Sequence, residues 1–281
     1  MRKLCSFLLG LVFLVHAEAG AATIESAAGV IKITGEIVDG DFDKLLKVVS
    51  ERSEIWGFED FEFVLNSPGG DVVESMKIAE FARDMWTTTQ IIPARESYAF
   101  LRKGEVTGDS ACVLIFIAGT HRRYIGYNEL PDRESHPLGL HRPYFSPKSN
   151  AALSPRDAEL AYNQLEEDYR AAMARYGATE EFIERTFRTG SAHIDRVSSI
   201  EFYNNYFPII VPWLDEYMQA KCPGLSYEET MYLSKLMVQT DLDEEAKRQK
   251  DLLMTRNSTS YRCRDKIEAE HRNQAFAKYV K

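Results

Sequence analysis

The chain has 281 residues, of which 44% are hydrophobic, and it carries a formal net charge of −9. This composition is sufficient for the sizeable core of a globular protein. The negative charge, without any run rich in lysine and arginine, argues against a nucleic-acid surface, because phosphate binding requires clustered positive charge. We therefore expect a protein, a peptide or a small molecule as substrate or partner.

Residues 1–21 have the pattern of a secretory signal peptide. Arg2 and Lys3 precede an apolar stretch over 4–15, and small residues follow at Ala17 and Ala19. The apolar stretch is about a dozen residues long, which is shorter than the roughly 20 residues that span a bilayer. We expect cleavage after about residue 20 and a periplasmic or secreted bacterial protein, with an uncleaved anchor as the alternative. No later stretch is long and apolar enough to cross a membrane.

The first half of the remaining chain predicts alternating strands and helices. The strand before Asn66 leads into a turn with Pro68, after which apolar residues recur at helical spacing and Asp71 is placed to cap the helix. A strand, a helix and another strand in this order form a βαβ unit, which implies parallel strands joined by a right-handed crossover. The predicted strands are 30–37, 61–65 and 88–93, and the predicted helices are 42–49 and 72–85.

The second half contains more helix. Ser110 to Gly119 is nearly all apolar and ends in glycine, which favours a short buried helix closed by a glycine cap, with a buried strand as the alternative. We expect polar loops at 95–108 and 128–136, a strand over 138–144, and helices at 155–176, 180–187 and 199–206. From Pro212 the chain becomes strongly charged and helical. These elements predict an α/β protein with a core domain over 22–211 and an extension over 212–281.

The cysteines indicate one disulfide. Cys5 leaves with the signal peptide, so an odd number remains: Cys112, Cys222 and Cys263. Cys222 and Cys263 flank the polar C-terminal region, and their disulfide in an oxidising compartment would contribute roughly 4 kcal/mol. Cys112 lies in an apolar run and is expected to be a buried thiol. We expect no metal, because the ligand spacings of the common metal motifs do not occur.

The Pro68-Gly69-Gly70 turn has a chemical use. Glycine lets the backbone turn so that an N–H group points outward near the positive N-terminus of a helix, where it can bind an oxyanion. By itself the segment is more often a tight turn, and a serine such as Ser110 at the head of a helix is more often a cap. The order of the segments along the chain adds the information.

This order resembles a known family. Asn66–Gly70 stands between a strand and a helix, Ser110 follows at the head of an apolar segment, and His141 lies in a strand-like segment with Pro143. Over about residues 27–210 the arrangement is similar to the proteolytic subunit of the Clp protease. Ser110-Ala111-Cys112 matches the exported Clp-like proteins of bacteria, where it replaces the Ser-Met-Gly of the cytosolic protease. The resemblance implies a ClpP/crotonase-like spiral of ββα units, here with a helical C-terminal extension.

The resemblance also implies roles for individual residues. Ser110 would be the nucleophile, His141 the base and Asp195, before the last core helix, the third member of a triad. A serine hydroxyl needs a base within about 3 Å, and a neutral imidazole needs a carboxylate to hold its tautomer. The implied oxyanion hole consists of the N–H groups of Gly69 or Gly70 and of Ala111. The other histidines that compete for the role of base are His121, His136 and His193.

Two positions depart from the family. Asp109 stands where a small residue is expected, and its carboxylate would repel an oxyanion if it pointed inward. Arg142 replaces the usual glutamine after the histidine. The leading hypothesis is a periplasmic serine peptidase or hydrolase that needs no cofactor and no ATPase partner and acts on a peptide or protein. The resemblance also implies a homo-oligomer, unless the C-terminal extension blocks stacking. The alternatives are a catalytically inactive scaffold that binds a protein partner and, with less support, an acyl-CoA enzyme.

Overall fold

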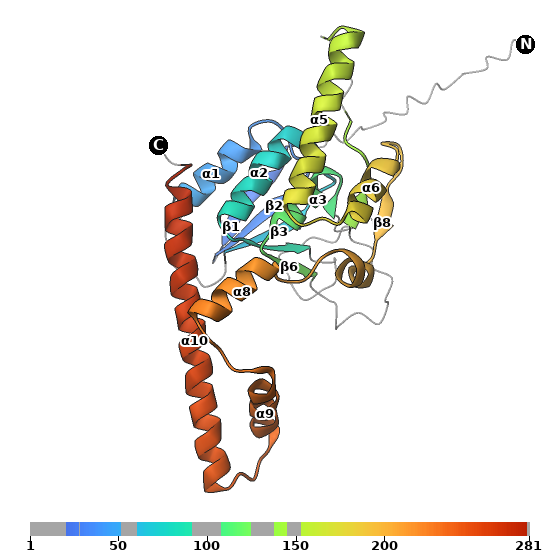
Figure 1. Cartoon of the computed structure of the whole chain (residues 1–281). Helices are drawn as coiled ribbons and strands as arrows, with labels where there is room; N and C mark the ends of the chain where they lie inside the picture. Colours follow the sequence, from blue (N-terminus) through green and yellow to red (C-terminus); the bar gives the residue numbers. More distant parts are fainter. Residues whose placement is uncertain are drawn as a thin grey trace, which may run out of the picture.

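The structure is a computed structural model, and it describes residues 21–27, 29–51, 61–91, 108–124, 138–144 and 153–279. Most of the predicted signal peptide and the predicted loop over 128–136 lie outside these residues. The described chain is an α/β protein with a five-stranded sheet in the order β1-β2-β3-β4-β6 and a three-stranded sheet in the order β5-β7-β8. Figure 1 shows these sheets in one body, from which two helical segments project.

The strands are β1 (Thr23–Ala27), β2 (Val30–Thr34), β3 (Glu62–Asn66), β4 (Thr88–Ile91), β5 (Gly108–Asp109), β6 (His121–Tyr124), β7 (Leu138–Leu140) and β8 (Asp195–Val197). The helices are α1 (Asp41–Glu51), α2 (Val72–Asp84), α3 (Ala111–Ala118), α5 (Pro155–Arg175), α6 (Glu180–Arg188), α7 (Ser199–Glu201), the π-helical turn η2 (Phe202–Tyr206), α8 (Pro212–Lys221), α9 (Tyr227–Val238) and α10 (Glu244–Phe276).

The predicted βαβ unit is confirmed. β3 and β4 pair in parallel on either side of α2 in the chain. Asp71 caps α2, since its side chain accepts the backbone N–H of Glu74 at 2.8 Å. The strands that the sequence did not predict are short or polar. β6 reads His-Arg-Arg-Tyr, and Arg122 within it is 1% exposed, so no apolar alternation marks this strand.

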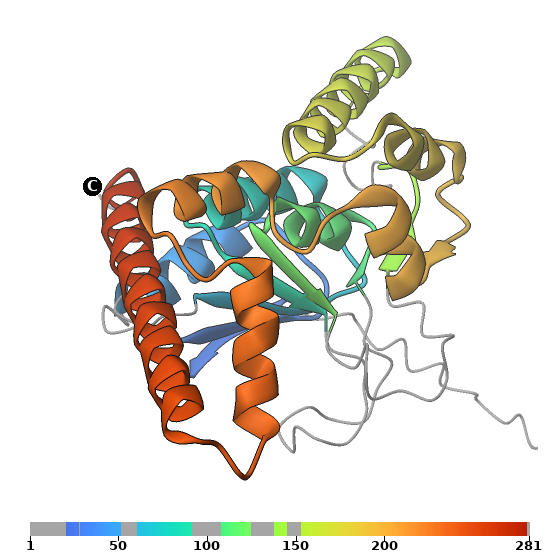
Figure 2. The same ribbon diagram turned by 60° about the horizontal axis from the view of Figure 1, so that its bottom comes forward.

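The core lies between the larger sheet and the helices α2 and α3, which pack against each other (Figure 2). Every residue of α3 is buried, in agreement with the predicted buried helix. The predicted glycine cap is wrong in one respect, because Gly119 has φ −52° rather than the left-handed conformation. Gly119 is required for packing instead: a Cβ there would collide with the side chain of Thr89.

A buried arginine, Arg122, and a half-buried one, Arg83, join the ends of α3 and α5. Arg122 donates to the carbonyls of Ile117 and Tyr176, each at 2.9 Å, and Arg83 donates to the same two carbonyls. These carbonyls lie in or just after the last turns of their helices, where backbone oxygens lack helical partners and cations are favoured. Burial lowers the pKa of Arg122 to about 9. The guanidinium groups therefore hold the C-terminal ends of α3 and α5 together.

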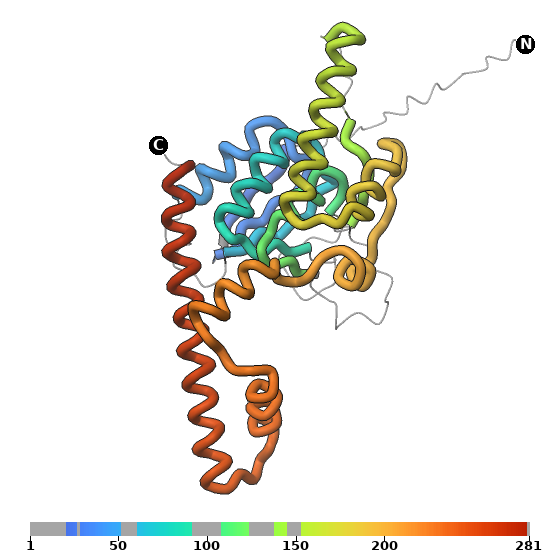
Figure 3. The backbone as a smooth tube through the Cα atoms, in the orientation of Figure 1, coloured from blue at the N-terminus to red at the C-terminus, as the bar shows by residue number. Residues whose placement is uncertain are grey.

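The C-terminal region is helical, as predicted. Cys222 and Cys263 form the predicted disulfide with a Cα–Cα distance of 5.6 Å, and Cys112 is free and buried. Figure 3 shows α9 and the first part of α10 as a helical hairpin that extends from the body. The far end of α10 returns to the domain, where Ala275 belongs to the main core and Phe276 packs against it. None of the described helices is both long enough and apolar enough to cross a membrane.

A histidine mediates the contact between α10 and the body. The His271 ring stacks on Trp86 with a centroid distance of 3.6 Å, and its Nε2 lies 2.8 Å from the carbonyl oxygen of Asp84. Trp86 lies two residues after the end of α2 and adopts φ 51°. Burial lowers the pKa of His271, against the opposing influence of Asp84.

This contact predicts a pH dependence of stability. Because the folded pKa of His271 is depressed, its contribution is complete above the unfolded pKa of about 6.5 and is lost as the pH falls towards the folded value. We expect the thermal midpoint to fall between about pH 7.5 and 5.5 by more in the unmodified chain than in His271→Gln. Equal slopes for the two chains would contradict this expectation.

Candidate functional site

Ser110 occupies a strained turn between β5 and α3. Its backbone has φ 56° and ψ −127°, a conformation that costs a residue other than glycine on the order of 1–3 kcal/mol. Although Ser110 is the N-cap residue of α3, its side chain makes no capping hydrogen bond. The structure therefore removes the simplest explanation for a serine at this position, because the hydroxyl does not stabilise the helix.

Hydrogen bonds from neighbouring elements hold this turn. The Ser110 N–H donates to the carbonyl of Gly139 at 2.8 Å. The Ser110 carbonyl accepts the Val113 N–H at 3.0 Å and the Tyr169 hydroxyl at 3.4 Å. A strained conformation persists only where the surrounding structure holds it, and here strand β7 and helix α5 provide the contacts that do so.

The glycine turn packs directly on Ser110. A Cβ added to Gly69 would lie 2.5 Å from the Ser110 Cβ and 3.0 Å from the Ala111 nitrogen, so only glycine permits this approach. The Gly69 N–H donates to the Ser67 hydroxyl at 3.0 Å. Within the described part of the chain, the N–H groups of Gly70 and Ala111 donate to no acceptor. Of the predicted oxyanion-hole residues, Gly70 and Ala111 therefore keep available donors, whereas the amide of Gly69 is used within the turn.

His141 follows the strand that pairs with β5. The parallel register aligns Asp109 with Gly139, so Ser110 and His141 both leave their strands at the same end of the small sheet. The Nδ1 of His141 lies 2.9 Å from the Arg142 carbonyl oxygen. Because a carbonyl oxygen only accepts, Nδ1 carries a proton, and in the neutral ring Nε2 then holds the lone pair that a general base needs. His141 is 8% exposed, and its ring centroid is 5.7 Å from that of Tyr144.

Asp195 is near His141 along the sheet but has another partner. β8 pairs with β7 so that Asp195 is opposite Leu140, the residue before His141. Its carboxylate binds Arg185 through two hydrogen bonds of 2.6 and 2.9 Å. The hydrogen bond from Arg185 lowers the pKa of Asp195 and keeps it ionised. No carboxylate of the described residues is hydrogen-bonded to His141.

Asp109 is paired with an arginine and lies against β7. It is 4% exposed, and both of its oxygens bind Arg196, at 2.5 and 3.0 Å. The carboxylate occupies the space that a side chain at Gly139 would take. Arg196 of β8 therefore compensates the negative charge of Asp109 beside Ser110. Sequence reasoning assigned no role to Arg196 or Arg185, and no local pattern indicates which carboxylates they bind.

The remaining candidates are placed elsewhere. His121 begins β6 in the larger sheet, His193 is exposed in the turn before β8, and His136 lies outside the described residues. Burial raises the pKa of the Cys112 thiol to about 12, so this cysteine is not a reactive thiolate. The described residues contain no group of three or more side chains that could hold a metal ion.

Ser110, His141 and the N–H groups of Gly70 and Ala111 are groups that could serve as a nucleophile, a base and oxyanion donors. No hydrogen bond joins Ser110 to His141 within the described residues. Comparison with known proteins does not identify the family of the chain, because neither a family model nor a curated protein matches it.

Proposed function

We propose that the chain is an exported serine hydrolase of ClpP-like fold that acts on a peptide or protein. The observation that carries the proposal is the backbone of Ser110, which is strained at a strand-to-helix turn while its hydroxyl makes no capping hydrogen bond to the helix. Strain of this kind is found where a nucleophile is held out of its helix towards a substrate. The disulfide is compatible with export, in keeping with the predicted signal peptide.

The proposed reaction is acyl transfer in two steps. The Ser110 oxygen attacks the carbonyl carbon of the substrate while His141 Nε2 takes the hydroxyl proton. The oxygen of the tetrahedral intermediate accepts hydrogen bonds from the N–H groups of Gly70 and Ala111 at the positive N-terminus of α3. His141 then protonates the leaving amine, and water hydrolyses the acyl-enzyme by the same route. This mechanism uses no cofactor and no ATP.

The histidine in this proposal is oriented by a backbone carbonyl. Arg142 supplies the acceptor for Nδ1–H, the place that the resemblance gave to Asp195. A neutral acceptor stabilises the imidazolium less than a carboxylate does, so we expect slower acylation than in a complete triad. If the Asp195 carboxylate released Arg185 and accepted a hydrogen bond from His141 Nδ1–H instead, the triad would be complete.

The finer fold assignment, a ClpP/crotonase-like spiral of ββα units, is also proposed. It is supported by the parallel pairing of β2, β3, β4 and β6, with a helix between successive members of the described chain. The approach of the Gly69 turn to the head of α3 further supports it.

A fluorophosphonate probe tests the proposal. We expect the folded protein to be labelled, and Ser110→Ala and Ser110→Gly to reduce labelling by at least about 10³-fold. The two variants should differ in stability, because glycine adopts the Ser110 conformation without strain; Ser110→Gly should be about 1 kcal/mol more stable than Ser110→Ala. Thermal unfolding measures this difference.

The ion pair of Asp195 favours the second candidate, an inactive scaffold. With Asp195 held by Arg185, no triad is assembled in this conformation. Absence of labelling of folded protein between about pH 6 and 9 would support the scaffold and reject the hydrolase.

A further inference from the structure

The α9–α10 hairpin carries apolar side chains on its outer surface. Tyr227, Met231 and Val238 are 79%, 54% and 82% exposed, and their spacing places them on one face of α9. The buried residues Leu233 and Leu236 lie on the opposite face of the same helix. We call Tyr227, Met231 and Val238 the α9 stripe. A helix that is apolar on two opposite faces has contacts to make on both of them.

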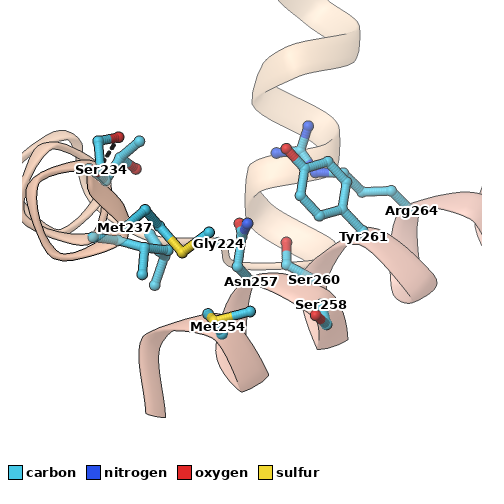
Figure 4. A pocket seen from close by; sticks show the side chains of 12 residues that line it. Gly224, Ser234, Met237, Met254, Asn257, Ser258, Ser260, Tyr261 and Arg264 are labelled. Carbon is cyan, nitrogen blue, oxygen red and sulfur yellow. Dashed lines mark hydrogen bonds between the residues drawn. The ribbon is translucent and has the colours of Figure 1, made fainter. Parts of the chain in front are cut away.

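A groove runs along the hairpin beside this stripe. One hollow of about 490 Å³ lies between the helices, and a second of about 440 Å³ continues along α10. Figure 4 shows Met237 of α9 on one side of the first hollow, with Met254 and Tyr261 of α10 on the other. Met254 and Ser258 line both hollows, so the two hollows adjoin, and together they are the groove. Methionine adapts to an irregular partner surface better than branched residues do.

The charges of this surface are complementary to each other. Arg264 lines the first hollow, Arg262 and Asp251 line the second, and neither arginine binds a carboxylate within the described residues. Glu228 and Lys235 flank the stripe, Asp241 follows its end, and neither carboxylate binds a cation of the described chain. The surface of the hairpin therefore carries both the α9 stripe and the groove. It also carries acidic and basic side chains that are not paired with each other within the described residues.

We propose that the hairpin is a self-association surface, in which the α9 stripe of a second copy occupies the groove. A two-fold contact uses the same patch on both subunits and therefore has to be self-complementary, as this surface is. Two such hairpins pack as an antiparallel four-helix bundle, the usual way for helical hairpins to cover their apolar faces. The Cys222–Cys263 disulfide anchors the base of each hairpin and preorganises it. This inference does not depend on the proposed hydrolase activity.

Light scattering on the full disulfide-bonded chain tests the proposal. We expect twice the mass of the same sample unfolded in denaturant, with a dimer that weakens as salt is raised. Met231→Lys places a charge in the interface and should weaken the dimer at least tenfold. Leu252→Lys is the matched control, because Leu252 is 53% exposed, lies on the same hairpin and lines neither hollow. Its dimer should be unchanged.

A charge exchange identifies the second copy as the occupant. Arg262→Glu with Arg264→Glu should give a monomer, as should Glu228→Lys with Asp241→Lys. An equimolar mixture of the two double variants should recover the dimer mass. A monomer at every concentration up to about 100 µM, a range that covers weak association, would overturn the proposal. So would equal effects of Met231→Lys and Leu252→Lys, or a mixture that stays monomeric.

Discussion

Gly69→Ala is expected to abolish labelling at Ser110 and to lower the free energy of unfolding by roughly 3 kcal/mol. The new Cβ would lie 2.5 Å from the Ser110 Cβ, 2.7 Å from the Asp109 carbonyl oxygen and 3.0 Å from the Ala111 nitrogen. Two of these atoms belong to the backbone of the strained turn and cannot move without changing it. The methyl group would therefore displace the nucleophile and the Ala111 amide together.

Gly177→Ala is the matched control for this variant. Gly177 has φ +88°, close to the +95° of Gly69, but a Cβ there would meet nothing within 4 Å. It should lose only the conformational cost of about 1–2 kcal/mol and keep full labelling. Labelling rates and denaturant unfolding measure both effects. If Gly69→Ala labels as fast as Gly177→Ala, the contact between the glycine turn and Ser110 has no role in the site.

Arg196→Ala is expected to slow labelling at Ser110 at least tenfold and to lower stability by about 2 kcal/mol. Removing one partner of a buried pair leaves an uncompensated charge, which costs about 3–5 kcal/mol when both groups are buried. The side chain of Arg196 is 36% exposed, whereas that of Asp109 is 6% exposed, so the expected loss is smaller. Without Arg196, the Asp109 carboxylate would also repel the oxyanion formed at the adjacent serine.

Two further variants make this prediction specific. Arg256→Ala breaks an ion pair of the same two-bond form with Glu229, but on the exposed hairpin, where such pairs contribute less than about 1 kcal/mol. Asp109→Asn added to Arg196→Ala removes the uncompensated charge and should restore most of the labelling rate. Failure of this second change to restore labelling would show that Arg196 acts by some means other than neutralising Asp109.

The local patterns of the sequence predicted much of the fold. Apolar spacing located α2, α3 and α5 within a few residues of their observed ends, and the helix cap at Asp71 followed from its place before the apolar run. The strands β1, β5, β6 and β8 were not predicted. β5 and β8 have only two or three residues, and β6 buries an arginine. Their strand character comes from neighbours distant in the chain.

In the candidate site, too, local patterns predicted some features, and contacts between distant segments decided the others. The positions of the glycine turn, Ser110 and His141 could be inferred from the order of segments along the chain, because each carries a local signature. The φ of Ser110, the carbonyl that holds His141 and the arginines that bind Asp109 and Asp195 could not. Arg196 meets Asp109 across 87 residues, and Arg185 takes Asp195 from a neighbouring helix.

By itself, then, the sequence determined which residues are candidates for the functional site and which segments become helices, because side-chain type and periodicity are local properties. Only the tertiary structure decided which charges are compensated and which donors stay available. It also decided that the Ser110 hydroxyl is not used as a helix cap. Ion pairs, close approaches and backbone strain depend on the register of distant strands, and that register is set when the whole core packs.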